Sequence, residues 1–158
     1  IRQFSQLAPN IKLVMAGRDV TTQNRELKSF IAEHDLEHLV VLLGEVSETE
    51  LLNPMFDVSV SSSLWGEGFS NTLGESMACG IPVIATNVGD SAMLVGDAGI
   101  VVEPNNVDAL AQSLWSFYQQ TETERIQIRQ RARARIVDQF SIDRMINAYQ
   151  KFFRNTNQ

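Results

Sequence analysis

The chain has 158 residues, of which 44% are hydrophobic and 20% are charged. This is about the length of one domain and close to the average composition of globular proteins, which excludes a disordered, collagen-like or coiled-coil chain. The single cysteine, Cys79, excludes a disulfide framework and any zinc site built from several thiolates. A formal net charge of -6 argues against a general phosphate-tracking surface, so we expect no nucleic-acid partner.

Short apolar runs alternate with amphipathic segments along the chain. This alternation is typical of an α/β fold, in which a parallel sheet carries helices on both faces. Strands are predicted at 11–16, 39–43, 58–62, 82–86 and 99–102. Helices are predicted to begin near Thr22, Glu48, Asn71, Ser91 and Asn106, and two more to cover 122–139 and 142–154. Because the strands are almost continuously apolar, we expect one Rossmann-like, doubly wound sheet that is covered on both faces.

The first ten residues look like the end of a helix. Ile1, Phe4 and Leu7 recur at helical spacing before Pro9. Together with the absence of an initial Met, this leads us to expect that a strand and most of a helix precede Ile1 in a longer protein. Residues 1–10 do not resemble a signal peptide, and no apolar run approaches the roughly 18 residues of a membrane span. We therefore expect a cytoplasmic location.

The segment 61–86 carries the chemistry. A predicted strand enters a polar loop in which Gly66 and Gly68 flank Glu67, and a helix follows that ends at Gly80. With Ser70 or Asn71 as its cap, this helix would direct its first N–H groups back into the loop. Such a helix terminus attracts an anion by roughly 0.3 to 1 kcal/mol, or about 2 kcal/mol when partly buried. The segment predicts a site for a ligand that combines a phosphate with a polyol.

Two carboxylates, Glu67 and Glu75, lie eight residues apart in this segment. On one continuous helix they would be about 12 Å apart along the axis, beyond the roughly 5 to 9.5 Å used by glycoside hydrolases. Hydrogen bonding to ligand hydroxyls is the better interpretation, because bonds to a charged group contribute roughly 1.5 to 3 kcal/mol. The alternative left open is that Glu75 only solvates its helix and Glu67 is an ordinary loop charge.

The pattern Glu67-x7-Glu75, within Glu-Gly-Phe-Ser-Asn-Thr-Leu-Gly-Glu-Ser-Met-Ala-Cys-Gly-Ile-Pro-Val-Ile-Ala-Thr, resembles a known family. It is similar to the C-terminal, nucleotide-sugar-binding domain of the retaining glycosyltransferases of family 4, which have the GT-B fold. Further matches in the same order lie at 13–17, 40–46, 57–62, 89–91, 95–102 and 108–110. The resemblance covers about residues 4 to 115.

The resemblance implies one donor-binding domain over residues 1–158 and three groups of site residues. The catalytic residue that contacts the transferred sugar is Glu67. The backbone N–H groups that line the sugar and the diphosphate belong to Gly68, Phe69, Ser70 and Asn71. The residues expected near the nucleotide are Glu75 at the ribose hydroxyls, Leu73 packed beside it, Gly44, Glu45 and Val46 at the base edge, and Gly17 and Arg18 at a phosphate or the base.

The implied reaction moves a sugar, with retention, from a nucleoside-diphosphate sugar to an acceptor hydroxyl. The acceptor would be a saccharide or a lipid-linked molecule in polysaccharide or glycolipid biosynthesis, and neither a metal nor another cofactor is implied. The family's basic pair and its acceptor-binding N-terminal domain have no counterpart in residues 1–158. In a sheet of order 3-2-1-4-5-6 the absent first strand is the central one. We therefore expect this segment alone to be inactive, and its helices at 122–154 to pack on the N-terminal domain.

Two other classes of function stay open at this point. The same fold serves sugar-nucleotide epimerases and sugar-phosphate synthases, and a noncatalytic nucleotide-binding or interaction module could have the same sequence features.

Four other features have interpretations independent of the family. His34-Asp-Leu-Glu-His38 fits a zinc pattern, but a helix end is favoured because the strand at 39–43 follows at once. Cys79 is expected to be a small buried thiol. The α-helical arginines at 125, 129, 131, 133 and 135 are expected to be solvated and paired with Glu122 and Glu124, with contact to an anionic membrane surface at the inner face as the alternative. Trp65 is expected either to cover the sugar pocket or to pack under its loop.

Overall fold

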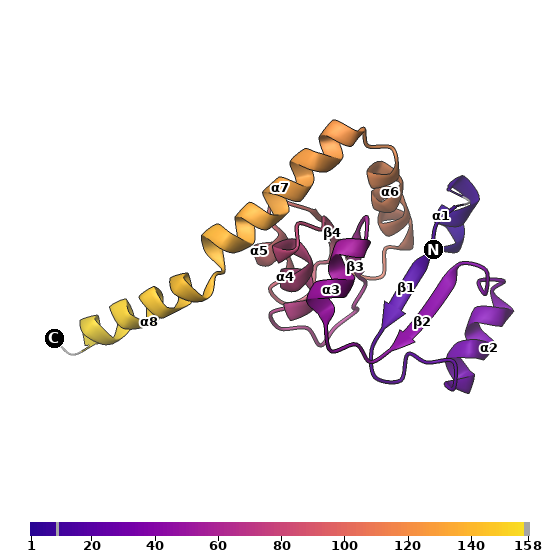
Figure 1. Cartoon of the computed structure of the whole chain (residues 1–158), viewed down its shortest axis with the longest axis horizontal. Helices are drawn as coiled ribbons and strands as arrows, with labels where there is room; N and C mark the ends of the chain where they lie inside the picture. Colours follow the sequence, from indigo (N-terminus) through magenta and orange to yellow (C-terminus); the bar gives the residue numbers. More distant parts are fainter. Residues whose placement is uncertain (9, 157–158) are drawn as a thin grey trace.

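The computed structural model describes residues 1–8 and 10–156, so that Pro9 lies outside the described residues. All five predicted strands are present, with ends within two residues of the predicted ones; they are β1 (Leu13–Ala16), β2 (Val40–Gly44), β3 (Ser59–Ser61), β4 (Val83–Thr86) and β5 (Ile100–Val102) (Figure 1). The helices are α1 (Arg2–Leu7), α2 (Arg25–Glu33), α3 (Thr49–Leu52), the 3-10 turn η1 (Asn53–Met55), α4 (Asn71–Ala78), α5 (Ser91–Val95), α6 (Val107–Tyr118), α7 (Glu122–Gln139) and α8 (Ile142–Thr156).

The described strands form two parallel sheets instead of the single sheet predicted. One sheet has the order β1-β2 and the other has the order β3-β4-β5. This grouping is what the order 3-2-1-4-5-6 leaves when its first strand is taken out. The prediction of a parallel α/β fold is confirmed, whereas the backbone hydrogen bonding is interrupted between β1 and β3.

The sheet β3-β4-β5 is covered by helices on both faces, and the side chains of its middle strand β4 alternate between two cores. Val83 and Ala85 pack in one cluster with Leu73 of α4 and Leu94 of α5. Ile84 points the other way, into a cluster with the buried aromatic ring of α6 and with α7. All four residues of β4 are buried, as expected for a strand between two layers of helices.

The sheet β1-β2 has one covered face. Ile31 of α2 packs with Leu39, and the side chains of Val40 and Leu42 join this cluster. Val41 and Leu43 alternate with them and are 38% and 42% exposed. The prediction that every strand is covered on both faces is therefore wrong for β2, since α2 covers one side of this sheet only.

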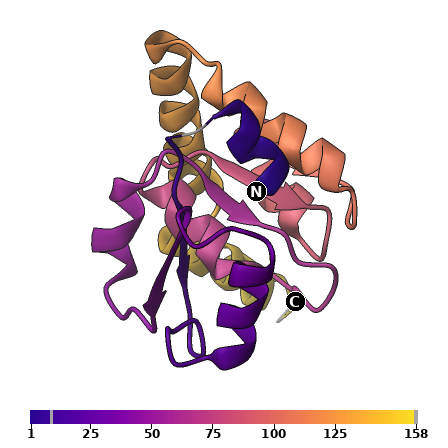
Figure 2. The same cartoon turned by 90° about the vertical axis from the view of Figure 1, so that its right-hand side faces the viewer.

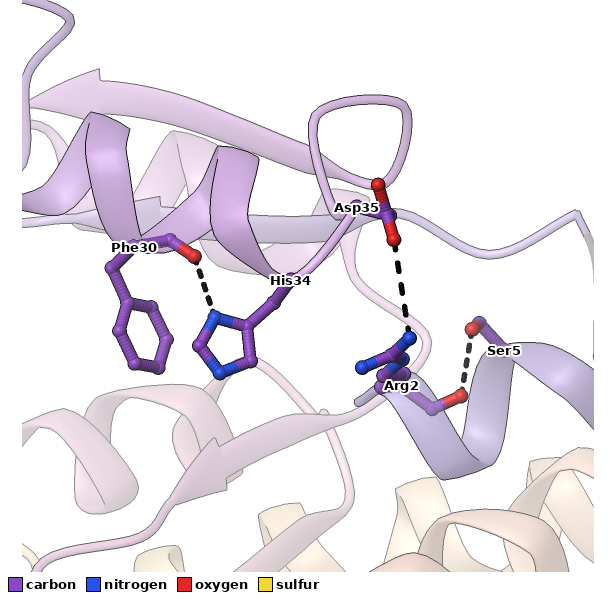
Figure 3. A network of polar contacts seen from close by, with 5 residues as sticks. All are labelled: Arg2, Ser5, Phe30, His34 and Asp35. Carbon is purple, nitrogen blue, oxygen red and sulfur yellow. Dashed lines mark hydrogen bonds and ion pairs between the residues drawn. The ribbon is translucent and has the colours of Figure 1, made fainter.

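The short helix α1 confirms the predicted helix end before β1. It joins the two halves of the molecule. Ile1 packs against the α2 cluster, while Phe4 makes an edge-to-face contact with Tyr118 of α6 at 6.0 Å between ring centroids. Figure 2 shows α1 lying beside α6. On its other side Arg2 forms an exposed ion pair with Asp35, next to His34, whose ring donates to the carbonyl of Phe30 (Figure 3).

The arginines of α7 hold helix ends and connections in the second half of the molecule. Arg129 donates to the carbonyl of Phe56 at 3.0 Å, and Arg133 donates to the carbonyl of Ala78 at the end of α4. Arg135 donates to the carbonyls of Met93 and Leu94, the latter at 2.7 Å. Cations in such positions stabilise the negative end of a helix. The expected pairing with Glu122 and Glu124 is thus replaced by bonds to backbone oxygens.

Glu124 instead serves the start of α7. Its carboxylate accepts a hydrogen bond from the Thr121 backbone N–H at 2.8 Å, while the Thr121 hydroxyl accepts from the Glu124 N–H. The hydrogen bonds from the Thr121 backbone and hydroxyl lower the pKa of Glu124. Its stabilising contribution is therefore present above the ordinary glutamate pKa and is lost as the pH falls.

Helix α8 projects from the rest of the molecule (Figure 1). Its large apolar side chains are exposed: Ile142, Met145, Ile146, Tyr149, Phe152 and Phe153. The predicted packing of these C-terminal helices on another domain stays a prediction. Within residues 1–8 and 10–156, no helix combines the length and the apolar composition that crossing a membrane requires.

Replacing Arg135 with Met should lower the free energy of unfolding by about 1.5 to 3 kcal/mol, because a mostly buried guanidinium bonded to two carbonyls is lost. Urea denaturation followed by circular dichroism measures this difference. The matched control is Arg131→Met on the exposed side of the same helix, which should change stability by less than about 0.5 kcal/mol. Equal effects of the two variants would contradict the assigned role of Arg135.

Candidate functional site

The loop that follows β3 holds Glu67 in place through two successive hydrogen bonds. The buried Thr86 hydroxyl at the end of β4 donates to the carbonyl of Ser63 at 2.6 Å. The Ser63 hydroxyl donates in turn to the Glu67 carboxylate at 2.8 Å. Glu67 is half-buried, so this carboxylate is oriented by β3 and β4 and is not an ordinary solvated loop charge.

The backbone of this loop rests on the turn after β4. The Asp90 N–H donates to the carbonyl of Gly68 at 3.1 Å. A Cβ atom placed on Gly89 would lie 2.6 Å from the Gly68 carbonyl oxygen and closer still to that of Glu67. Gly89 also has a φ of +56°, a conformation that side chains disfavour. The close approach of these two loops therefore requires glycine at position 89.

Helix α4 begins directly after the loop, with Ser70 in the N-cap position, as predicted. The Ser70 side chain is buried and makes no capping hydrogen bond. The expected side-chain cap is therefore absent at Ser70, and the first N–H groups of α4, beginning at Asn71, are left for another acceptor. A phosphate or carboxylate is the kind of ligand that such a terminus binds.

Glu75 lies one turn into α4 and is exposed. Its carboxylate accepts a hydrogen bond at 2.9 Å from the hydroxyl of Thr49, the first residue of α3. The two acids are thus anchored separately, Glu67 by its own loop and Glu75 by the connection between β2 and β3.

The ends of β1 and β2 meet at a pair of backbone hydrogen bonds. The Gly17 N–H donates to the Gly44 carbonyl at 2.7 Å, and the Gly44 N–H donates to the Val20 carbonyl at 2.8 Å. Next to this pair, the side chains of Arg18 and Glu45 are exposed and Val46 is half-buried. The structure therefore brings together the two turns that were predicted near the nucleotide.

The side chain of Leu73 has other surroundings than expected, and the ring of Phe69 packs against a ring of this chain. Leu73 is fully buried in the core with Val83 and Leu94, because it lies on the inner face of α4, and its side chain offers no surface to a ligand. The ring of Phe69 packs on Phe140 at 5.6 Å between centroids, and the role predicted for the Phe69 backbone N–H group stays a prediction.

The structure excludes one of the two alternatives for Trp65 and differs from the expectation for Cys79. Trp65 is 82% exposed, so it does not pack under the loop. Cys79 is half-buried at the C-cap of α4 instead of fully buried. The helix α2 ends at Glu33 with His34 as its C-cap, which confirms the predicted helix end in the His-x-x-Glu-His pattern.

Two open hollows of about 420 and 260 Å³ lie on α7 and at the start of α2, and predicted site residues line neither.

Sequence reasoning missed the residues that position the two acids. Ser63 and Thr86 lie in the segment 61–86 but carried no signal beyond being hydroxyl residues near strand ends. Thr49 lies in a separate part of the sequence, and its contact with Glu75 depends on how α3 crosses α4. Gly89, in contrast, precedes a polar Asp-Ser pair after a strand, which is a recognisable turn signal.

A layered parallel α/β fold, in which a helix without a side-chain cap begins after the loop that follows a strand, is typical of Rossmann-like domains. Residues 1–120 match the family of glycosyl transferases group 1, and the chain belongs to this family. Its fold is that of the C-terminal domains of GT-B glycosyltransferases.

Three similar proteins illustrate the relationship. One is the Campylobacter jejuni protein named N-acetylgalactosamine-N,N'-diacetylbacillosaminyl-diphospho-undecaprenol 4-alpha-N-acetylgalactosaminyltransferase. The chain is 35% identical to it over 117 residues, and this match covers 72% of this chain and 31% of that protein. A solved glycosyltransferase from Rickettsia africae matches with a TM-score of 0.85 and 27% identity, over 98% of this chain and 42% of that one. Anabaena HepE in complex with UDP has a TM-score of 0.85 at 22% identity, over 98% and 44%.

The chain therefore spans less than half of the length of these three proteins.

Gly89→Ala should lower the free energy of unfolding by about 1 to 3 kcal/mol, because the new methyl group would displace the Glu67 loop and would adopt a disfavoured φ. Thermal and urea denaturation measure the change. Gly74→Ala in α4 is the matched control, since nothing lies within 4 Å of its added Cβ. This control should be stabilised by roughly 0.5 to 1 kcal/mol. A tolerated Gly89→Ala would show that the two loops do not touch as described.

Proposed function

We propose that this chain is the donor-binding half of a retaining glycosyltransferase, which moves a sugar from a nucleoside-diphosphate sugar to an acceptor hydroxyl. The observation that carries the proposal is the start of α4. The first N–H groups of α4 have no side-chain cap. Glu67 is anchored in the loop before this helix start, and Glu75 is anchored one turn after it. A ligand with both an anionic and a hydroxyl-rich part matches this arrangement.

In this proposal each part of the donor has its own partner. The diphosphate binds at the backbone N–H groups of Gly68 to Asn71, and the sugar hydroxyls donate to Glu67. The ribose hydroxyls donate to Glu75, and the base lies along Gly44 to Val46. Arg18, exposed after β1, provides a cation for the phosphates or a contact for the base. Leu73 supports this site from the core and does not touch the nucleotide.

The chemical contribution of these groups is stabilisation of the leaving diphosphate. Fixed N–H dipoles at the start of α4 would oppose the charge that develops as the glycosidic bond breaks. The acceptor oxygen would bond to the anomeric carbon on the face from which the diphosphate leaves, while the departing phosphate oxygen takes the acceptor proton, so that configuration is retained. The reaction written this way needs neither a metal ion nor another cofactor.

The relatives support the class of donor and acceptor in this proposal. The Anabaena structure contains UDP, and the name of the Campylobacter relative describes an acceptor linked through diphosphate to undecaprenol. We infer a nucleotide-sugar donor and a saccharide or lipid-linked acceptor in polysaccharide or glycolipid biosynthesis. The acceptor would be bound by an N-terminal domain, on which α7 and α8 would pack.

A lipid-linked acceptor would place the enzyme at the cytoplasmic face of a membrane, and we include this location in the proposal. The arginines of α7 offer less to an anionic surface than their number suggests. Four of them donate to carbonyls of this chain: Arg125, Arg129, Arg133 and Arg135. Arg131 lies exposed among them and is the cation of this helix with which lipid head groups would pair.

The test of the proposal uses the complete open reading frame that contains this chain. Calorimetric titration with UDP, GDP and ADP should reveal binding of at least one nucleotide in the micromolar to millimolar range. Sugar transfer from the matching nucleotide sugar to an acceptor would then separate a transferase from an epimerase or a sugar-phosphate synthase. No binding at millimolar nucleotide would favour the noncatalytic module instead.

Glu75→Ala should weaken nucleoside-diphosphate binding at least tenfold, because hydrogen bonds from the ribose to a charged acceptor are lost. Calorimetry on the variant and the unchanged protein gives the ratio. Glu122→Ala, an exposed acid at the start of α7, serves as the control and should leave the affinity unchanged. A loss of less than threefold in Glu75→Ala would show that Glu75 does not bind the ribose.

A further inference from the structure

The connection between β2 and β3 is fastened to helix α4 at two places. Thr49, the first residue of α3, donates to Glu75 at 2.9 Å. Asn53, which ends α3, accepts a hydrogen bond from the Ser76 hydroxyl at 3.0 Å. Glu75 and Ser76, which are adjacent in α4, thus bind the two ends of the single turn of α3.

Of these two hydrogen bonds, the one between Ser76 and Asn53 stabilises the fold. Both Asn53 and Ser76 are buried, at 7% and 0% exposure, and a broken bond there would leave buried polar atoms unpaired. The turn η1 continues from Asn53 to Met55, and the carbonyl of the next residue, Phe56, accepts a hydrogen bond from Arg129 of α7. Because α3 is one turn long, these anchors also fix where Thr49 lies against α4.

The bond at Thr49 has a different character. Glu75 is exposed and Thr49 is half-buried, so their hydrogen bond adds little to the stability of the fold. Its effect is on the carboxylate, since an exposed glutamate otherwise samples many rotamers that binding must freeze. A carboxylate has about four acceptor positions, so that a single bond to one oxygen leaves the others for a ligand.

We propose that Thr49 is a positioning residue, whose hydroxyl holds the Glu75 carboxylate in the orientation that accepts the ribose hydroxyls of the nucleotide. This inference rests on the proposed function, in which Glu75 binds the ribose. Thr49 follows the turn at Gly44 to Val46 by three residues, so it also sets the distance between the base contact and the ribose contact. Preorganisation of this kind raises affinity by lowering the cost of ordering the site.

The ribose is remote from the reacting atoms of the donor, so Glu75 would bind it equally well in the ground state and in the transition state. Loss of the Thr49 hydroxyl should therefore raise KM for the nucleotide sugar and leave kcat unchanged. The expected size is roughly three- to tenfold, corresponding to one hydrogen bond between side chains.

The experiment compares Thr49→Val, which removes the hydroxyl at nearly constant shape, with Thr49→Ser, which keeps it. Calorimetry on the full protein measures the affinity for the ribonucleoside diphosphate that it binds best and for the 2',3'-dideoxy form of the same nucleotide. Thr49→Val should weaken ribonucleotide binding roughly three- to tenfold and leave dideoxynucleotide binding within about twofold. Thr49→Ser should restore the preference for the ribonucleotide, and Thr123→Val on α7, a matched control, should leave it intact.

Each other outcome overturns a defined part of this account. If the unchanged protein prefers the ribonucleotide and Thr49→Val keeps the same preference, Thr49 has no positioning role, while the proposed function stands. Equal weakening of both nucleotides in Thr49→Val would assign Thr49 to the fold and overturn the inference as well. If the unchanged protein binds neither nucleotide, the proposed function fails and the role of Thr49 fails with it.

Discussion

The structure depends on how two separate sheets are held together without a backbone ladder between them. Among the described strands, β1 pairs with β2 and β3 pairs with β4, so side chains must join the halves. One junction is α1, where Phe4 meets Tyr118 of α6. The other is α3 against α4, with hydrogen bonds at Glu75 and Ser76. The candidate site spans the second junction, and its geometry therefore follows from a few specific contacts.

The two halves contribute to the site in different ways. The half with β3 to β5 is covered on both faces and provides the loop of Glu67, which rests on the glycine turn at Gly89 and on the buried Thr86 hydroxyl. The half with β1 and β2 is covered on one face and provides exposed turns at Arg18 and Glu45. The half with β3 to β5 thus provides a hydrogen-bonded loop, whereas the half with β1 and β2 provides exposed turns.

The strands, the start of α4 and the helix α7 could be predicted from the sequence, because they follow from local periodicity, glycine signals and capping residues. Prediction failed where the burial or contact of a residue depends on elements that are distant in the sequence. Val41 is as apolar as Val40, yet one is exposed because α2 covers a single face. Leu73 was expected at the nucleotide, but its position on α4 directs it into the core. The bond between Thr49 and Glu75 joins residues 26 apart, and no local pattern encodes it.

The arginines of α7 have a consequence for how this family could be studied through its sequences. Arg133 and Arg135 bind main-chain oxygens, which every amino acid at positions 78, 93 and 94 supplies equally. Pairs of contacting side chains tend to change together, whereas a side chain that binds a carbonyl has no partner whose identity must follow. Covariation between columns of an alignment would therefore overlook the packing of α7 on α4 and α5, although these bonds hold both helices in place.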